Sequence, residues 1–123
     1  MIVKSYTDLE QSKKLAEFLP LESADMEYMF LKEDNSKVSN IPFIKDDDEP
    51  EWPNDSAYYF IPCWSLAALL GVLPYPSLHK TFAGWRCDSY DKEGKTCKLG
   101  ENTDNPVDAC YEMIIKLHEL KML

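Results

Sequence analysis

The C-terminal stretch NPVDACYEMIIKLHEL, residues 105–120, decides how we expect this chain to fold. Asn105 is a favourable N-cap, Pro106 fits the first helical turn, and Asp108 suits the positive end of the helix dipole. The apolar residues that follow recur at helical spacing and form a core stripe of Val107, Cys110, Met113, Ile114, Leu117 and Leu120. The stretch therefore predicts an amphipathic helix that needs a sheet or another helix to cover it.

A wider apolar arc on the same helix has two interpretations. Tyr111, Ile115 and Met122 extend the stripe around one flank, so that only a narrow polar face remains. The helix can lie in a groove between the sheet and another helix, which is the simpler interpretation. Its flank can also contact a second subunit, which would make the protein a homodimer through the C-terminal helix.

Two further helices are marked by their starts. Thr7 and Glu10 have the spacing of a capping box, and the helix that follows should end at Pro20. Ser65 can cap a helix over residues 66–73, whose composition is apolar nearly all round. Such a composition predicts a buried central helix.

Between the helices the pattern indicates short strands. Residues 26–31 are apolar at both alternating positions, as in a strand covered on both faces, and residues 58–61 resemble them. Residues 37–44 suit an edge strand because Pro42 limits its hydrogen bonding. Residues 85–90 and 95–99 flank a turn that contains Gly94, which predicts a hairpin. We therefore expect one globular α+β domain over residues 1–123, with a small, mainly antiparallel sheet packed by N-terminal, central and C-terminal helices.

The charge is strongly negative and unevenly distributed. The chain has 22 acidic and 13 basic side chains, a formal charge of −9, which disfavours binding to nucleic acids. Six of the acids lie within residues 46–55. A calcium-loop register there would put Pro50 at a ligand position and Ala57 at the closing carboxylate, so a solvated loop is the better interpretation.

Residues 56–79 lack charged side chains but are not expected to cross a membrane. Pro62, Pro74 and Pro76 divide them, whereas a spanning helix needs about 20 consecutive apolar residues. The first residues turn polar at once, unlike a secretory signal, so the expected location is the cytoplasm.

The cysteines and serines do not predict a catalytic or metal site. The spacing of the four cysteines does not match a zinc framework, and Cys63 and Cys110 stand in apolar contexts that suit a core. Cys87 and Cys97 flank the predicted hairpin, which leaves a disulfide or metal role open for them. Ser65 has no nearby histidine, so capping is the better interpretation. The chain lacks a phosphate-binding glycine loop, and we expect no cofactor.

Two tryptophans and an acidic run form the candidate interaction surface. Trp52 lies between two prolines inside the acidic run, where its ring either folds back as a lid or is offered to a partner. Trp85 beside Arg86 suggests either a recognition patch or a core ring beside an exposed charge. The candidate surface comprises Asp46, Asp47, Asp48, Glu49, Glu51, Trp52, Trp85 and Arg86.

Three segments resemble a family of small uncharacterised proteins of gut Bacteroidetes, often encoded in prophage-like or other mobile regions. They are residues 23–28 (SADMEY), 61–70 (IPCWSLAALL) and 105–110 (NPVDAC). The resemblance covers most of the chain but implies no reaction or site residues. The acidic loop and the cysteine-containing hairpin have no counterpart in it.

Together these features favour a cytosolic, non-catalytic accessory protein, of a mobile element or its host, that binds another protein. The alternative is a small-molecule-binding module or small enzyme with a pocket between the sheet and the central helix, where Ser65, Asp25 or tyrosines would converge. A DNA mimic is the weakest of the three hypotheses, because the excess charge is confined to one loop.

Overall fold

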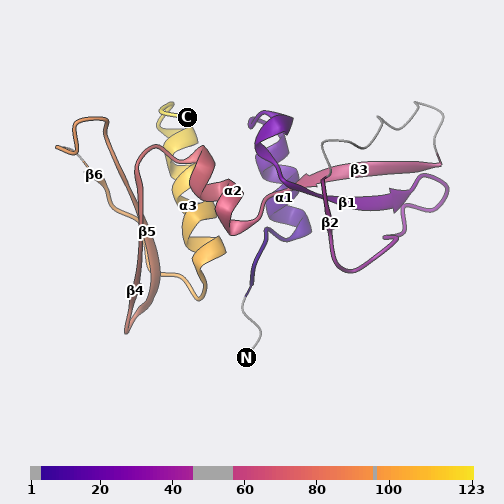
Figure 1. Cartoon of the computed structure of the whole chain (residues 1–123), viewed down its shortest axis with the longest axis horizontal. Helices are drawn as coiled ribbons and strands as arrows, with labels where there is room; N and C mark the ends of the chain where they lie inside the picture. Colours follow the sequence, from indigo (N-terminus) through magenta and orange to yellow (C-terminus); the bar gives the residue numbers. More distant parts are fainter. Residues whose placement is uncertain (1–3, 46–56, 96) are drawn as a thin grey trace. The chain divides into compact units, whose positions relative to one another are not determined.

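The computed structural model describes residues 4–45, 57–95 and 97–123, and confirms the α+β fold class. The elements in chain order are α1 (Leu9–Ala16), the 3-10 turn η1 (Leu21–Ser23), β1 (Met26–Leu31), β2 (Phe43–Ile44), β3 (Tyr58–Cys63), α2 (Leu66–Val72), β4 (Pro76–Thr81), β5 (Gly84–Tyr90), β6 (Cys97–Lys98) and α3 (Pro106–Glu119) (Figure 1). The strands that the structure describes form two antiparallel sheets, in the orders β2-β1-β3 and β4-β5-β6. The single sheet of the prediction is therefore divided in two.

The chain divides into two compact units. The N-terminal unit spans Asp8–Trp64, and the C-terminal unit contains Ser65–Leu123 together with the residues up to Thr7. One domain can contain two such units, so the expectation of a single domain stays a prediction.

In the N-terminal unit, the cap of α1 lies one residue later than predicted. Asp8 accepts a hydrogen bond from the backbone N–H of Gln11 at 2.8 Å, and the Gln11 side chain accepts one from the N–H of Asp8 at 3.1 Å. The capping box of Thr7 and Glu10 is therefore wrong in register. Asp is at least as good an N-cap as Thr, and the Thr7 side chain is fully buried instead.

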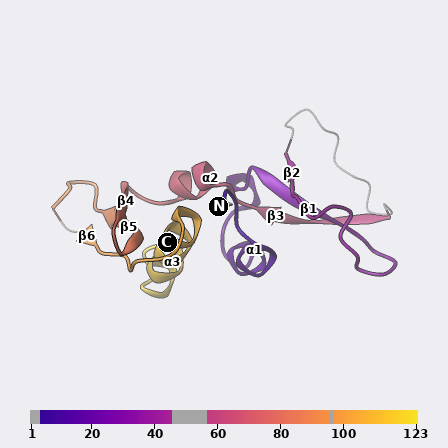
Figure 2. The same cartoon turned by 90° about the horizontal axis from the view of Figure 1, so that it is seen from below.

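The sheet of this unit is buried mainly on one face. β1 pairs with β3 so that Phe30 lies opposite Tyr59, and their rings stack with centroids 5.2 Å apart. Tyr28 and Phe30 are buried, whereas the alternating residues Met29 and Leu31 are only half-buried. The expectation of cover on both faces is therefore wrong. Figure 2 shows α1 along the sheet on the β3 side.

A buried tryptophan lies at the end of the N-terminal unit. Trp64 follows β3, is fully buried, and donates from Nε1 to the hydroxyl of Ser23 at 2.9 Å. That hydroxyl in turn donates to the carbonyl of Pro20 at 2.6 Å. The end of β3 is thus tied to the turn that follows α1.

In the C-terminal unit, α3 is the predicted amphipathic helix. Asn105 accepts from the N–H of Asp108 at 2.8 Å, which confirms the cap. Its buried residues, which face the sheet and α2, are Pro106, Val107, Ala109, Cys110, Met113, Ile114 and Leu117. Leu120 is 49% exposed, so its place in the core stripe was wrong. The helix ends at Glu119, and Lys121 adopts a positive φ of 59°, which turns the chain away.

Strand β4 was not predicted, because Pro74 and Pro76 mask it. Pro76 is the first residue of an edge strand, where its missing N–H costs no ladder hydrogen bond. β4 pairs with β5 around the tip residues 82–83, and Phe82 at this tip is fully exposed. Gly84, with φ of 123°, follows the tip, and a Cβ there would lie 2.4 Å from the carbonyl oxygen of Thr103. The predicted β5–β6 hairpin is confirmed.

The central helix is less buried than its composition predicts. Ser65 caps α2 by accepting from the N–H of Ala68 at 3.2 Å, as expected. Leu69 is the only fully buried residue within Leu66–Val72, while Ala67 and Gly71 are exposed. A short helix at the edge of a small unit has too little protein around it to cover every side, so the prediction of a buried α2 is wrong.

Candidate functional site

The acidic part of the candidate interaction surface, Asp46 to Trp52, lies outside the described residues. Trp85 and Arg86 lie on β5 and, as neighbours in a strand, point to opposite faces of the sheet. Trp85 is half-buried, exchanges backbone hydrogen bonds with Thr103, and has the Lys80 ammonium group 5.6 Å from its ring centre. The surface as a whole stays a prediction.

Arg86 belongs to a polar quartet on one face of the β4–β5 pair. The quartet consists of Ser77, His79, Arg86 and Asp88, with Ser77 opposite Asp88 and His79 opposite Arg86. Asp88 is almost completely buried and accepts from Arg86 at 3.1 Å and from the backbone N–H of Gly100 at 3.0 Å. His79 Nε2 lies 3.4 Å from the same carboxylate.

The quartet contains serine, histidine and aspartate, but not in the geometry of a hydrolase. Ser77 Oγ lies 3.0 Å from His79 Nε2, and this is the nitrogen that also faces Asp88. In a catalytic triad the carboxylate holds one ring nitrogen while the serine uses the other. Through Asp88, which accepts from the backbone N–H of Gly100, the quartet instead connects β5 to the segment after β6.

Two buried thiols meet between β5 and α3. Cys87 and Cys110 are both fully buried, and a hydrogen bond joins their side chains. This hydrogen bond and burial raise the pKa of Cys110, whereas accepting the bond lowers the pKa of Cys87. Cys87 thus lies beside Cys110 rather than Cys97, and all four cysteines are free thiols. Cys97 contacts Tyr90, and their hydrogen bond raises the pKa of the tyrosine hydroxyl.

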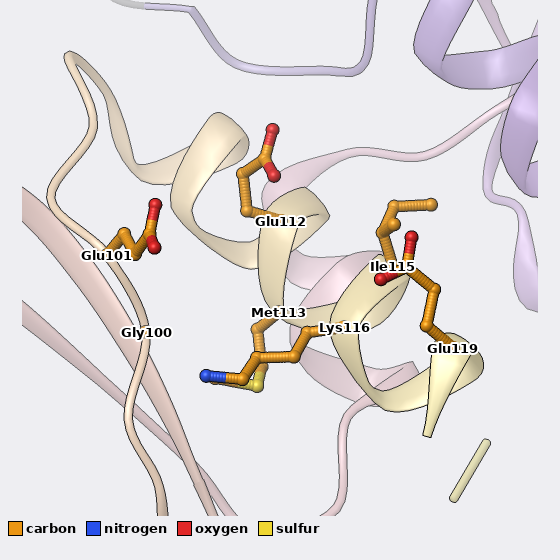
Figure 3. Close-up of a pocket in the computed structure, with 7 residues that line it drawn as sticks. All are labelled: Gly100, Glu101, Glu112, Met113, Ile115, Lys116 and Glu119. Atoms are coloured by element: carbon orange, nitrogen blue, oxygen red, sulfur yellow. The ribbon is translucent and has the colours of Figure 1, made fainter. Parts of the chain in front are cut away.

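A groove of about 220 Å³ runs along α3 (Figure 3). We call it the α3 groove; its lining comprises Gly100, Glu101, Glu112, Met113, Ile115, Lys116 and Glu119. It exists because β6 has only two residues, so the segment around Gly100, rather than a strand, borders this flank of the helix. Met113 and Ile115 provide its apolar part.

The α3 groove is negatively charged. Glu112 and Glu119 are seven residues apart and therefore lie on one side of α3, while Glu101 comes from the loop after β6. The one cation, Lys116, donates to the carbonyl of Leu99 at 2.8 Å. Within the described part of the chain, none of the three carboxylates has an ion pair or hydrogen bond. The groove thus presents unpaired negative charge beside apolar side chains.

A second pocket, of about 290 Å³, lies at the other end of the sheet. We call it the tyrosine pocket; it is lined by Pro74, Tyr75, Ser89, Tyr90, Asp91, Lys92, Lys98, Leu117 and Met122. It lies at the connection from α2 to β4, and two tyrosines do converge there. Ser65, at the other end of α2, lines neither of these two pockets.

Sequence reasoning anticipated the residues of these sites only in part. Glu112, Lys116 and Glu119 lie on the narrow polar face that the helical periodicity of α3 predicts. Glu101 and the tyrosine pocket could not be found, because they depend on where the segment after β6 and the unpredicted strand β4 lie. Over the described ranges, no group of three or more histidine, cysteine or acidic side chains could hold a metal ion.

Comparison of the chain with family models, curated proteins and solved structures finds no match. The resemblance to the Bacteroidetes family and a homodimer through α3 therefore stay predictions. Among the helices that the structure describes, none has the length and apolar character that crossing a membrane requires.

Proposed function

We propose that this protein is a non-catalytic binding module whose α3 groove takes a basic, partly apolar segment of a partner protein. The observation that carries the proposal is that three carboxylates without a partner among the described residues line one groove together with the half-buried Ile115. Lysine or arginine side chains of the partner would reach the carboxylates, while an adjacent apolar side chain would contact Ile115. The cytosolic location and the mobile-element context remain parts of the proposal.

The charge of the whole chain favours the same kind of partner. A formal charge of −9 attracts positively charged segments over distances of about a Debye length and speeds their association. Two exposed leucines are sequence neighbours of residues that line the groove: Leu99, whose carbonyl accepts from Lys116, is 58% exposed, and Leu120 is 49% exposed. They add apolar area that a partner can cover.

The size of the groove favours recognition of a short segment. A volume of about 220 Å³ admits a few side chains and is below the ~300–1,000 Å³ of most small-molecule sites. In the polar quartet, Ser77 Oγ and the Asp88 carboxylate face the same nitrogen of His79, which differs from the arrangement in a catalytic triad and favours a non-catalytic role.

The experiment is selection of binders from a random peptide library displayed on phage, with the full chain as the target. We expect enrichment of peptides that combine Lys or Arg with aliphatic or aromatic residues, and weaker binding as salt is raised. The double variant Glu112→Gln/Glu119→Gln should weaken the selected peptides about threefold to tenfold.

The matched control is Glu22→Gln/Glu33→Gln, which removes two exposed carboxylates from the N-terminal unit. It changes the net charge equally, and we expect it to preserve most of the affinity. Equal losses in both double variants would show that net charge, not the groove, recognises the peptides. Selection without basic residues would also overturn the proposal.

A further inference from the structure

The tyrosine pocket combines an apolar interior with free positive charge at its mouth. We propose that it binds a small molecule with an apolar body and a terminal carboxylate, such as a medium-chain fatty acid. The site is separate from the α3 groove, so this inference stands or falls independently of the protein-binding function.

The interior of the pocket is mainly apolar. Leu117 and Met122 come from the end of α3 and the residues after it, and Pro74 and Tyr75 come from the α2–β4 connection. A volume of about 290 Å³ is just below the ~300–1,000 Å³ of most small-molecule sites. The pocket therefore suits an aliphatic chain or one aromatic ring rather than a large cofactor.

The backbone at Tyr75 is held in an unfavourable conformation at this pocket. Its φ is 43°, in the left-handed region that disfavours residues with a Cβ. Two hydrogen bonds maintain the conformation: the N–H of Tyr90 donates to the Tyr75 carbonyl at 3.1 Å, and Ser89 Oγ donates to the Pro74 carbonyl at 2.6 Å.

Burial does not compensate for this strain, because Tyr75 is 57% exposed. A strained residue that presents an aromatic ring at a pocket is typical of a binding site, where positioning matters more than stability.

The charges at the mouth select an anion. Lys92 and Lys98 line the pocket, and neither ammonium group has an ion pair or hydrogen bond to any residue that the structure describes. The acidic member, Asp91, accepts from the backbone N–H groups of Glu93 and Lys95 at 3.1 and 2.9 Å, so one of its oxygens is occupied by the turn. In a chain with nine excess negative charges, two unpaired lysines at one apolar pocket favour a carboxylate over a neutral or cationic ligand.

The experiment is titration of the ¹⁵N-labelled full chain with octanoate, followed by heteronuclear NMR. We expect saturable shifts at Tyr75, Tyr90 and Lys98. Octan-1-ol and octylammonium, which have the same chain, should bind at least about fivefold more weakly because they lack the negative charge. Equal binding of all three probes would overturn the preference for a carboxylate. Absence of saturable binding by octanoate would overturn the proposal that the pocket is a binding site.

Variants separate the two halves of the pocket. Lys92→Met/Lys98→Met should weaken octanoate about threefold to tenfold, while Lys13→Met/Lys32→Met, an equal charge change in the N-terminal unit, should not. Tyr75→Gly should raise the melting temperature by relieving the backbone and weaken octanoate by removing the ring, whereas Tyr75→Phe keeps the binding. If the lysine variants match their control, or if Tyr75→Gly binds as tightly as the native chain, the proposal is wrong.

Discussion

The two units use one plan with different proportions. Over the residues that the structure describes, each has a three-stranded antiparallel sheet and a helix packed against it, but α3 has 14 residues and α1 has eight. α3 buries seven residues, whereas α1 buries Ser12 and Leu15. The longer helix therefore supplies most of the core in the C-terminal unit, while the N-terminal unit depends more on its strands and on Trp64.

The difference also explains where the pockets lie. Both described pockets belong to the C-terminal unit and include residues of α3. A long helix on a sheet whose last strand, β6, has two residues leaves flanks that none of the described strands covers. Substitutions and labelling in each unit test this contrast.

Ile114→Ala should lower the free energy of unfolding by about 3 kcal/mol, because Ile114 is fully buried. The neighbouring Ile115, half-buried in the α3 groove, is the control, and its change to Ala should cost less than about 1 kcal/mol. Urea denaturation measures both. Similar losses for the two variants would contradict the view that one face of α3 forms the core.

Asp88→Ala should cost about 2 kcal/mol, because it removes the buried acceptor for Arg86 and for the N–H of Gly100. Asp88→Asn keeps an oxygen for Gly100 and should cost less. Ser77→Ala, on the same face, should change stability by less than about 0.5 kcal/mol. A loss for Asp88→Ala as small as that expected for Ser77→Ala, in the same denaturation experiment, would show that the quartet does not stabilise the fold.

Trp64→Phe tests the N-terminal unit in the same way. It removes the Nε1 hydrogen bond to Ser23 and part of a fully buried ring, and should cost about 1.5–2 kcal/mol. Amide hydrogen exchange should become faster in β1 and β3 and change less in β5 and α3. Equal acceleration in both units would show that they open together rather than as two compact units.

Thiol labelling compares the units without a substitution. Cys63 and Cys110 are fully buried, one in each unit, whereas Cys97 is half-buried and should react first with iodoacetamide. In the fold, the pKa of Cys110 lies above its unfolded value of about 8.5, so Cys110 stabilises the protein fully below pH 8.5 and progressively less as the pH rises.

Cys110 should therefore remain protonated and slow to react at about pH 9, when an unfolded thiol is largely ionised. Mass spectrometry of the labelled chain gives the order. We expect Cys63 to be labelled before Cys110, because the smaller helix cover of the N-terminal unit lets it open more easily. The reverse order would contradict this ranking of the units.

Local sequence signals predicted several elements correctly. Asn105 and Pro106 mark the start of α3, Ser65 caps α2, and Gly94, with a φ of 71°, lies in the β5–β6 turn. Each depends on bonds or backbone angles within a few residues, which neighbours in the chain can specify. Two predictions failed where the local sequence fits two patterns. Thr7 and Asp8 are both suitable N-caps for α1, and the prolines before β4 suit either a break in the chain or the start of an edge strand.

The sequence alone determined the α+β class, the strands of residues 26–31 and 58–61, and the helix that covers the C-terminal sheet, because apolar periodicity and capping are local properties. The tertiary structure decided that the sheet is divided in two, that Cys87 meets Cys110, and that Glu101 and Lys98 border separate pockets. These features depend on strand pairing and helix packing between residues distant in sequence, which no local pattern encodes.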